Sequence, residues 1–301
     1  MASAPPAVGP PPASSYMEAR MQKLQFIAQQ NEIRPDWVAR MRCMEGFSIC
    51  LLCDDSGSMA TPVHTGYSNR NMNPYGPVAS RWSELQGTTS LLVQLATALD
   101  PTGTVDVFFL NRPPLIGVQD ASQIPPAFAS PPNGFTPLAR VITQILQHKA
   151  AVLAERKLLL IIATDGQPTD DAGSVQIPQF LNLLMTKPQN MFVQIMACTD
   201  DEGTMAYLNR VDDQIPRLDV TDDYASEKKE ILRAQGPQFH FTYGDVSCRY
   251  NQPPYSLYTY YVHSSTAPIN HCPPPTLLFS PLAVRCKDDS GGGRPILRFL
   301  G

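Results

Sequence analysis

The pattern of apolar and polar residues along the chain predicts strands that alternate with helices. Three runs of strand length are almost wholly apolar, namely residues 47–53, 157–164 and 191–199. Such runs are typical of strands that are buried on both faces of a parallel sheet. Residues 104–110 alternate between apolar and polar positions, and residues 218–220 form a shorter run. These two segments predict a further strand and a brief edge strand.

Between the strands, apolar residues recur every three or four positions, which predicts helices. Residues 113–132 are instead rich in proline and leave room for one short strand at most. Strands and helices joined by short, right-handed connections predict an α/β fold with a doubly wound, mostly parallel sheet flanked by helices on both faces. The predicted helices span residues 16–31, 81–99, 136–152, 177–186, 203–211 and 224–234, with another short helix around Trp37.

Shifts in composition divide the chain into four parts. Residues 1–15 are rich in proline and alanine, which predicts a disordered arm. Residues 16–44 are predicted to form a helical brace on the outside of an α/β domain that spans residues 45–244. Residues 245–301 are rich in Pro, Tyr and Cys without any period, which predicts an irregular tail. Two interpretations of this tail stay open: an unstructured extension, or sequence that follows an atypical reading frame or splicing event.

Polar oxygen atoms gather where the first predicted strand ends. The apolar run 47–53 is followed at once by Asp54-Asp55-Ser56-Gly57-Ser58. Asp54, Ser56 and Ser58 occupy alternating positions, so an extended turn can direct their oxygens to one side while Gly57 lets the backbone bend. Open α/β sheets bind ligands at the carboxyl ends of their strands, and Mg²⁺ prefers oxygen ligands. For this motif alone, a turn that only caps the next helix is an equal alternative.

Two later segments supply further oxygen atoms. Thr136 lies in Gly134-Phe135-Thr136-Pro137-Leu138, at the start of a predicted helix, and Asp165 follows the apolar run 157–164. Thr136 and Pro137 also suit an N-cap followed by a first-turn proline. The interpretation as ligands is favoured because the other two motifs lie at the ends of strands that are expected to be neighbours.

Taken together, the three motifs Asp-x-Ser-x-Ser, Gly-x-Thr-Pro-Leu and Thr-Asp-Gly-x-Pro-Thr-Asp resemble the von Willebrand factor A (vWA) domain with its metal-ion-dependent adhesion site (MIDAS). The resemblance covers about residues 45–244 and implies a Rossmann-like fold. It also implies that a cation, Mg²⁺ or Mn²⁺, is held directly or through water by Asp54, Ser56, Ser58, Thr136 and Asp165.

The resemblance further implies a function in protein binding. In vWA domains of this kind, an open position on the metal accepts an Asp or Glu carboxylate from a partner protein. Binding in that family is coupled to movement of the threonine loop and the last helix, which here would be Thr136 and residues 224–234. We therefore expect a protein-binding module with an acidic partner.

Composition and charge narrow the setting in which the chain works. The formal net charge is −4, with 23 basic and 27 acidic residues, so no basic surface for nucleic acid is expected. No apolar stretch approaches the roughly 18 residues of a membrane span, and the first residues lack the features of a signal peptide. Three cysteines lie in apolar strand-like runs, as buried free thiols do in a reducing compartment. The chain is predicted to be cytoplasmic.

An enzyme is the competing class of function. A metal-dependent hydrolase could use a water activated by the same cation. However, no histidine lies in the three motifs, and neither a G-x-S-x-G elbow nor a phosphate-binding G-x-x-x-x-G-K-S/T loop is present. The chain is therefore predicted not to be an enzyme, with the hydrolase kept as the alternative. A structural scaffold with an empty site is a third interpretation.

Overall fold

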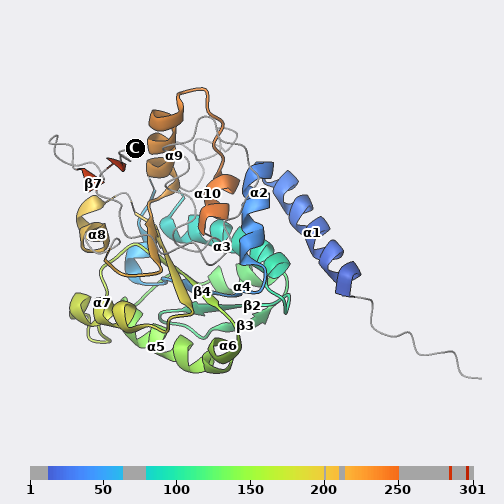
Figure 1. Ribbon diagram of the computed structural model, residues 1–301. Coiled ribbons are helices and arrows are strands. Elements are labelled where there is room, and N and C mark those ends of the chain that lie inside the picture. Colours follow the sequence, from blue (N-terminus) through green and yellow to red (C-terminus); the bar gives the residue numbers. More distant parts are fainter. Residues whose placement is uncertain are drawn as a thin grey trace, which may run out of the picture.

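The computed structural model describes residues 13–63, 79–199, 201–209 and 214–250, and the two short strands β7 and β8. A six-stranded sheet runs through the centre in the order β3-β2-β1-β4-β5-β6 (Figure 1). All neighbouring pairs are parallel except β2 and β3, which are antiparallel. The strands are β1 (Ser48–Cys53), β2 (Val105–Phe109), β3 (Leu115–Val118), β4 (Leu158–Thr164), β5 (Met191–Ala197), β6 (Leu218–Thr221), β7 (Arg285–Cys286) and β8 (Ile296–Leu297).

This strand order is that of a doubly wound α/β fold, so the predicted fold class is confirmed. Every residue of β1, β2 and β4 is buried, as the apolar runs predict for strands covered on both faces. The order reverses between β1 and β4, because the chain leaves these two neighbouring strands toward opposite edges of the sheet.

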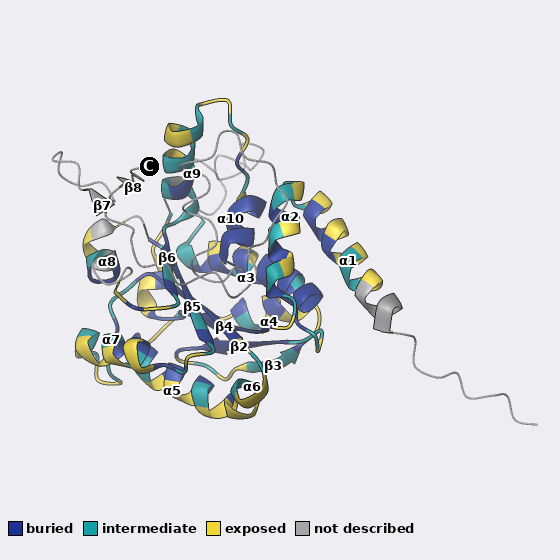
Figure 2. Cartoon of the chain, viewed as in Figure 1, coloured by how far each residue is buried: buried dark blue, intermediate teal, exposed yellow. Residues whose placement is uncertain are grey.

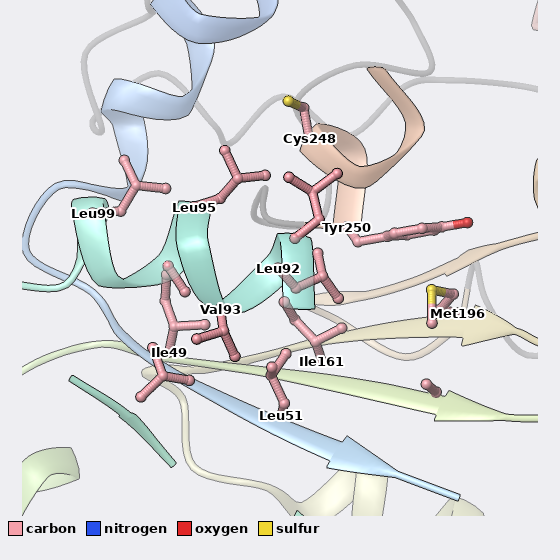
Figure 3. Close-up of a cluster of buried hydrophobic side chains, with 14 of the residues drawn as sticks. Ile49, Leu51, Leu92, Val93, Leu95, Leu99, Ile161, Met196, Cys248 and Tyr250 are labelled. Atoms are coloured by element: carbon pink, nitrogen blue, oxygen red, sulfur yellow. The ribbon is translucent and has the colours of Figure 1, made fainter. Parts of the chain in front are cut away.

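One face of the sheet is covered by α3 and the helices around it. Leu92 and Val93 of α3 lie toward Ile49 of β1 and Ile161 of β4 in the larger hydrophobic core, whereas Leu95 projects from the other side of the helix (Figure 3). Helices α1, α2, α4 and α10 contribute buried residues to the same core, and α9 packs against it. The helices and 3₁₀ helices of this side are α1 (Ala13–Gln30), α2 (Pro35–Met41), η1 (Arg42–Met44), η2 (Gly57–Ala60), α3 (Arg81–Leu99), η3 (Ala121–Gln123), α4 (Ile124–Phe128), α9 (Tyr224–Gln235) and α10 (Tyr243–Tyr250).

The opposite face is covered by α5, α6, α7 and α8, whose outer surfaces are largely exposed (Figure 2). Because successive side chains of a strand point to opposite faces, Cys50 and Leu52 belong to this second core while Leu51 and Cys53 belong to the first. The helices on this side are α5 (Leu138–His148), α6 (Ala150–Glu155), α7 (Ile177–Thr186) and α8 (Glu202–Asn209).

The N-terminal helices are more deeply packed than an external brace. Trp37 and Met41 of α2 are 2% and 0% exposed and belong to the same core as α3. Helix α1 begins at residue 13, so it includes the last residues of the predicted arm. Residues 1–12 of that arm lie outside the described residues.

The fold also continues past the expected start of the tail. Helix α10 crosses position 245, and all of its residues after Tyr243 are buried. Asp245 accepts hydrogen bonds from the backbone N–H groups of Arg34 (3.1 Å) and Thr242 (3.0 Å), which fixes α10 to the start of α2. The packed part of the chain therefore extends to Tyr250. Apart from β7 and β8, the rest of the predicted tail lies outside the described residues.

The proline-rich connection holds more structure than expected. Residues 115–118 form the one expected strand, β3, but α4 follows it. Two prolines lie in the first turn of α4, where a helix does not need their missing N–H groups. None of the helices in the described part of the chain is both long and apolar enough to cross a membrane.

Candidate metal-binding site

The predicted site lies where β1 and β4 end side by side. These strands pair in parallel up to Cys53 and Ala163, and the backbone N–H of Asp54 donates to the carbonyl of Ala163 (2.9 Å). Asp54 and Asp165 thus follow neighbouring strands at the same edge of the sheet. The strand order reverses here, and in doubly wound folds the binding crevice lies outside the carboxyl ends of the strands at this point.

Two serines connect the turn after β1 to the turn after β4. The hydroxyl oxygens of Ser56 and Ser58 are 3.0 Å apart, and Ser58 Oγ donates to Asp165 Oδ1 (2.7 Å). Ser56 and Asp165 are 2% and 3% exposed. The 3₁₀ helix η2 begins at Gly57, so the chain turns tightly enough to place both serines on one side.

Asp54 is fully buried below these hydroxyls. Its Oδ1 accepts a hydrogen bond from the backbone N–H of Ser56 (2.8 Å), and its Oδ2 accepts one from Thr164 Oγ1 (2.6 Å). Burial raises the pKa of Asp54 to about 6, and the nearby Asp165 carboxylate adds to the rise, while the hydrogen bonds oppose it. Two carboxylates that are close together and out of water are an environment that a cation stabilises.

Thr136 approaches Gly166, the residue after Asp165, from the loop before α5. Its backbone forms two hydrogen bonds with Thr169, one from Thr136 N to Thr169 Oγ1 and one from Thr169 N to Thr136 O, both 2.9 Å. Its own hydroxyl oxygen lies 3.8 Å from where a Cβ on Gly166 would be, which is next to Asp165. Helix α5 begins only at Leu138, and its cap residue is Pro137. The structure therefore does not use Thr136 as the N-cap of this helix.

These donors fit a small, hard cation. Two ligands at right angles, each about 2.0–2.1 Å from an ion, are about 2.9 Å apart. The separations of 3.0 Å between Ser56 and Ser58 and 2.7 Å between Ser58 and Asp165 are close to that value. The described residues contain no group of three or more His, Cys, Asp or Glu side chains that could hold a metal. The candidate set instead combines two carboxylates with three hydroxyls, and its binding of a metal stays a prediction.

Asp55 is a structural residue of the site that the sequence analysis left without a role. Its Oδ1 accepts from the backbone N–H of Asn111 (2.8 Å), its Oδ2 forms an ion pair with Arg112 Nε (2.6 Å), and its carbonyl accepts from Asn133 N (2.8 Å). Asp55 thus joins the ends of β1 and β2 to the loop that carries Thr136. The sequence shows a second acidic residue, Asp55, directly after Asp54. However, no local sequence pattern indicates that Asp55 forms an ion pair with Arg112.

Arg81 was also missed, because the sequence analysis treated it only as the first residue of a helix. Its Nη1 donates to Asp165 Oδ2 (2.9 Å), and its Nη2 donates to Thr199 Oγ1 (2.7 Å). The Arg81 side chain is 15% exposed and that of Asp165 is 0% exposed. The site therefore contains a partly buried positive charge from the protein itself.

Substituting Gly134 with alanine is expected to displace the Thr136 loop. Gly134 has a φ of +109°, and an added Cβ would lie 2.6 Å from Asn111 Cγ. Its carbonyl also accepts from Gly57 N (3.1 Å), so a shift here moves the loop relative to the serines. We expect a cost of about 1–3 kcal/mol in the free energy of unfolding and weaker Mg²⁺ binding, measured by urea unfolding and calorimetry.

Gly117→Ala is the matched control for this substitution. Gly117 also has a positive φ, of +67°, but an added Cβ would meet nothing within 4 Å. This variant is expected to lose some stability and to bind Mg²⁺ as the original protein does. Equal metal binding by the Gly134 and Gly117 variants would contradict the role of the loop.

The structure thus places Asp54, Ser56, Ser58 and Asp165 in one continuous set of contacts, with Thr136 beside it. The residues come from segments that are more than a hundred positions apart, and the sheet brings them together. No protein-family model matches this chain, and no curated protein matches it.

Proposed function

We propose that the chain is a vWA-like module that binds a protein partner through a divalent cation. Mg²⁺, or Mn²⁺ in its place, would be held directly or through water by the residues of the candidate site. The observation that carries the proposal is the arrangement at the ends of β1 and β4, where Ser58 bridges Ser56 and Asp165 above a buried Asp54. The candidate ligands are Asp54, Ser56, Ser58, Thr136 and Asp165.

The residues of the site suit the binding of a carboxylate rather than a reaction. Bound here, the cation would supply an electrophilic position for one oxygen of an incoming ligand. Ser56, Ser58 and Thr136 contribute neutral oxygens, so they do not cancel the charge of the ion. Asp165 is held by Ser58 through one oxygen and by Arg81 through the other. An Asp or Glu side chain of a partner protein is the ligand that such a position favours.

The state of the cysteines supports a cytoplasmic setting for this module. Cys43, Cys50, Cys53, Cys198 and Cys248 are free, and Cys50, Cys53 and Cys248 are buried. Burial raises the pKa of Cys53 to about 12, which keeps its thiol protonated and unreactive. Buried free thiols are typical of proteins in reducing compartments.

Thermal unfolding of the full chain with and without Mg²⁺ tests the proposal. A ligand that binds only the folded state adds about 2.7 kcal/mol of stability at a concentration of 100 times its Kd, so the melting temperature is expected to rise with Mg²⁺. Asp54→Ala and Asp165→Ala are expected to abolish this rise, and Ser58→Ala to reduce it without unfolding the protein. Asp171→Ala is the control, because Asp171 lies in the same connection between β4 and α7 as Asp165 but is exposed.

Absence of any rise up to millimolar Mg²⁺ or Mn²⁺ would contradict the metal site. The acidic partner is tested separately, with an array of peptides that each carry one central Asp and matched peptides that carry Asn. Binding is expected only for the Asp peptides and only without a chelator. Hydrolysis of ester or phosphoester substrates that is lost in Asp54→Ala and Asp165→Ala would instead favour the alternative of a hydrolase.

A further inference from the structure

We infer that Arg81 determines the ligand preference of the proposed metal site. By pairing with Asp165, it weakens the site's hold on the cation and strengthens the cation's attraction for a carboxylate. This inference rests on the proposed function, because it concerns the same ion. It assigns a specificity-determining role to a residue outside the candidate ligand set.

The position of Arg81 is fixed by its own helix. Arg81 is the first residue of α3, directly after the N-cap Ser80. Ser80 and Ser83 form a reciprocal capping box, in which the side chain of each accepts a hydrogen bond from the backbone of the other. The start of α3 is therefore well anchored, and the guanidinium is held from there to the ends of β4 and β5 through Asp165 and Thr199.

Arg81 also limits what the Asp165 carboxylate can do. Oδ1 of Asp165 accepts from Ser58, and Oδ2 accepts from Arg81, so each oxygen has a partner in a fully buried environment. A carboxylate held at both oxygens does not swing forward to bind an ion with both of them. Asp165 would therefore offer an ion at most one oxygen, Oδ1, which also accepts from Ser58.

The charges of the site show what this pairing changes. Asp54 and Asp165 carry two negative charges, and Arg81 returns one positive charge. Asp55 does not alter the balance, because Arg112 neutralises it. A divalent cation would thus leave a net charge of +1 at the site, whereas without Arg81 the sum would be zero. A net positive, partly buried site attracts an anionic ligand over a neutral one.

The Arg81 side chain also borders a cavity. Arg81 and Thr199 line a cavity of about 750 Å³ between α3, the end of β5, α9 and α10. The positive charge therefore lies at the boundary between the candidate ligands and an open cavity.

The test measures two affinities of the full-length protein. Mg²⁺ affinity is measured by calorimetry, and carboxylate affinity by titrating the Mn²⁺-loaded protein with acetate while following water-proton relaxation. Arg81→Leu is expected to bind Mg²⁺ about tenfold more tightly and acetate about tenfold more weakly, because one unit of positive charge near the ion is lost. Arg81→Lys keeps the charge and is expected to restore most of both values.

Arg156→Leu is the matched control, because it removes the same charge far from the site. Arg156 precedes β4 at the opposite end of the sheet, and its Nη1 lies 3.9 Å from Asp100 Oδ1. It is expected to leave both affinities unchanged. Metal-free melting curves identify any variant that fails to fold, and in that case Arg81→Gln is used in place of Arg81→Leu.

The two affinities separate the possible outcomes. Tighter Mg²⁺ binding together with weaker acetate binding supports the inference. Tighter Mg²⁺ binding with unchanged acetate binding would mean that Arg81 only competes with the metal, which overturns it. Unchanged Mg²⁺ binding also overturns it, while the proposed function stands if the original protein binds Mg²⁺. No Mg²⁺ binding by the original protein would overturn both.

Discussion

Replacing Asp55 with alanine is expected to lower the free energy of unfolding by about 3–5 kcal/mol, which is the usual cost of breaking one side of a buried ion pair. Asp55 is 1% exposed, and its partner Arg112 is 18% exposed. The change would leave the guanidinium without its charged partner and the backbone N–H of Asn111 without its acceptor. Urea unfolding monitored by circular dichroism measures the loss.

Two comparisons make this result specific. Asp171 also forms an ion pair, with Arg140, but the two side chains are 72% and 41% exposed, respectively. Asp171→Ala is therefore expected to lower the free energy of unfolding by less than about 1 kcal/mol. Arg112→Leu is also expected to destabilise the protein, and the double substitution with Asp55→Ala to cost less than the sum of the two. A cost for Asp55→Ala that is no larger than that for Asp171→Ala would show that the pair does not hold the loop.

Replacing Trp37 with alanine is the second substitution with a large expected effect, about 3–5 kcal/mol. Trp37 is among the largest fully buried side chains in the described part of the chain, and it packs within the core that α3 shares with β1. Its loss leaves a cavity that the surrounding helices fill only in part. Chemical unfolding measures the change, and we expect one cooperative transition at a lower denaturant concentration.

Phe26→Ala is the control for this substitution. Phe26 lies on α1, in the same N-terminal part of the chain, but its side chain is 59% exposed. It is expected to change the free energy of unfolding by less than about 0.5 kcal/mol. Equal effects for Trp37→Ala and Phe26→Ala would mean that α2 packs only loosely on the domain.

The main elements of the fold could be predicted from the sequence because buried strands and helices have characteristic patterns of apolar residues. Strands β1, β4 and β5 are covered on both faces, and their sequences are almost wholly apolar. Helices α3 and α7 were predicted with their observed bounds. For α3, Asp100 and Pro101 mark the end of the helix. The alternation of strands and helices predicted a doubly wound sheet, and the strands that precede Asp54 and Asp165 were expected to be neighbours, as β1 and β4 are.

The packing of the two ends of the chain could not be predicted in the same way. Helix α10 is short and lies in a segment whose composition changes at that point, so no period distinguishes it. Its burial depends on α2 and α3, which are more than a hundred residues away. Helix α4 was missed because its prolines argue against a helix unless they fall in the first turn.

For the candidate site, the sequence identified the oxygen donors but not the charges that surround them. Each predicted ligand lies shortly after a strand or shortly before a helix, and such positions can be recognised from the local sequence pattern. Arg81 and Arg112 meet their partners only through the tertiary fold, at sequence separations of 84 and 57. The sequence around a single arginine does not show whether its side chain forms a buried ion pair or is exposed to solvent.

The contact between α10 and the first helices has a consequence for synthesis on the ribosome. Gly244 lies so close to Asn31 and Ile33 that a side chain there would collide with them. Helices α1 and α2 leave the exit tunnel before α10, since α10 is translated about two hundred residues after the end of α2. We therefore expect a nascent chain to keep part of the apolar surface of α2 uncovered until Tyr250 has emerged, and chaperones bind apolar surface of this kind.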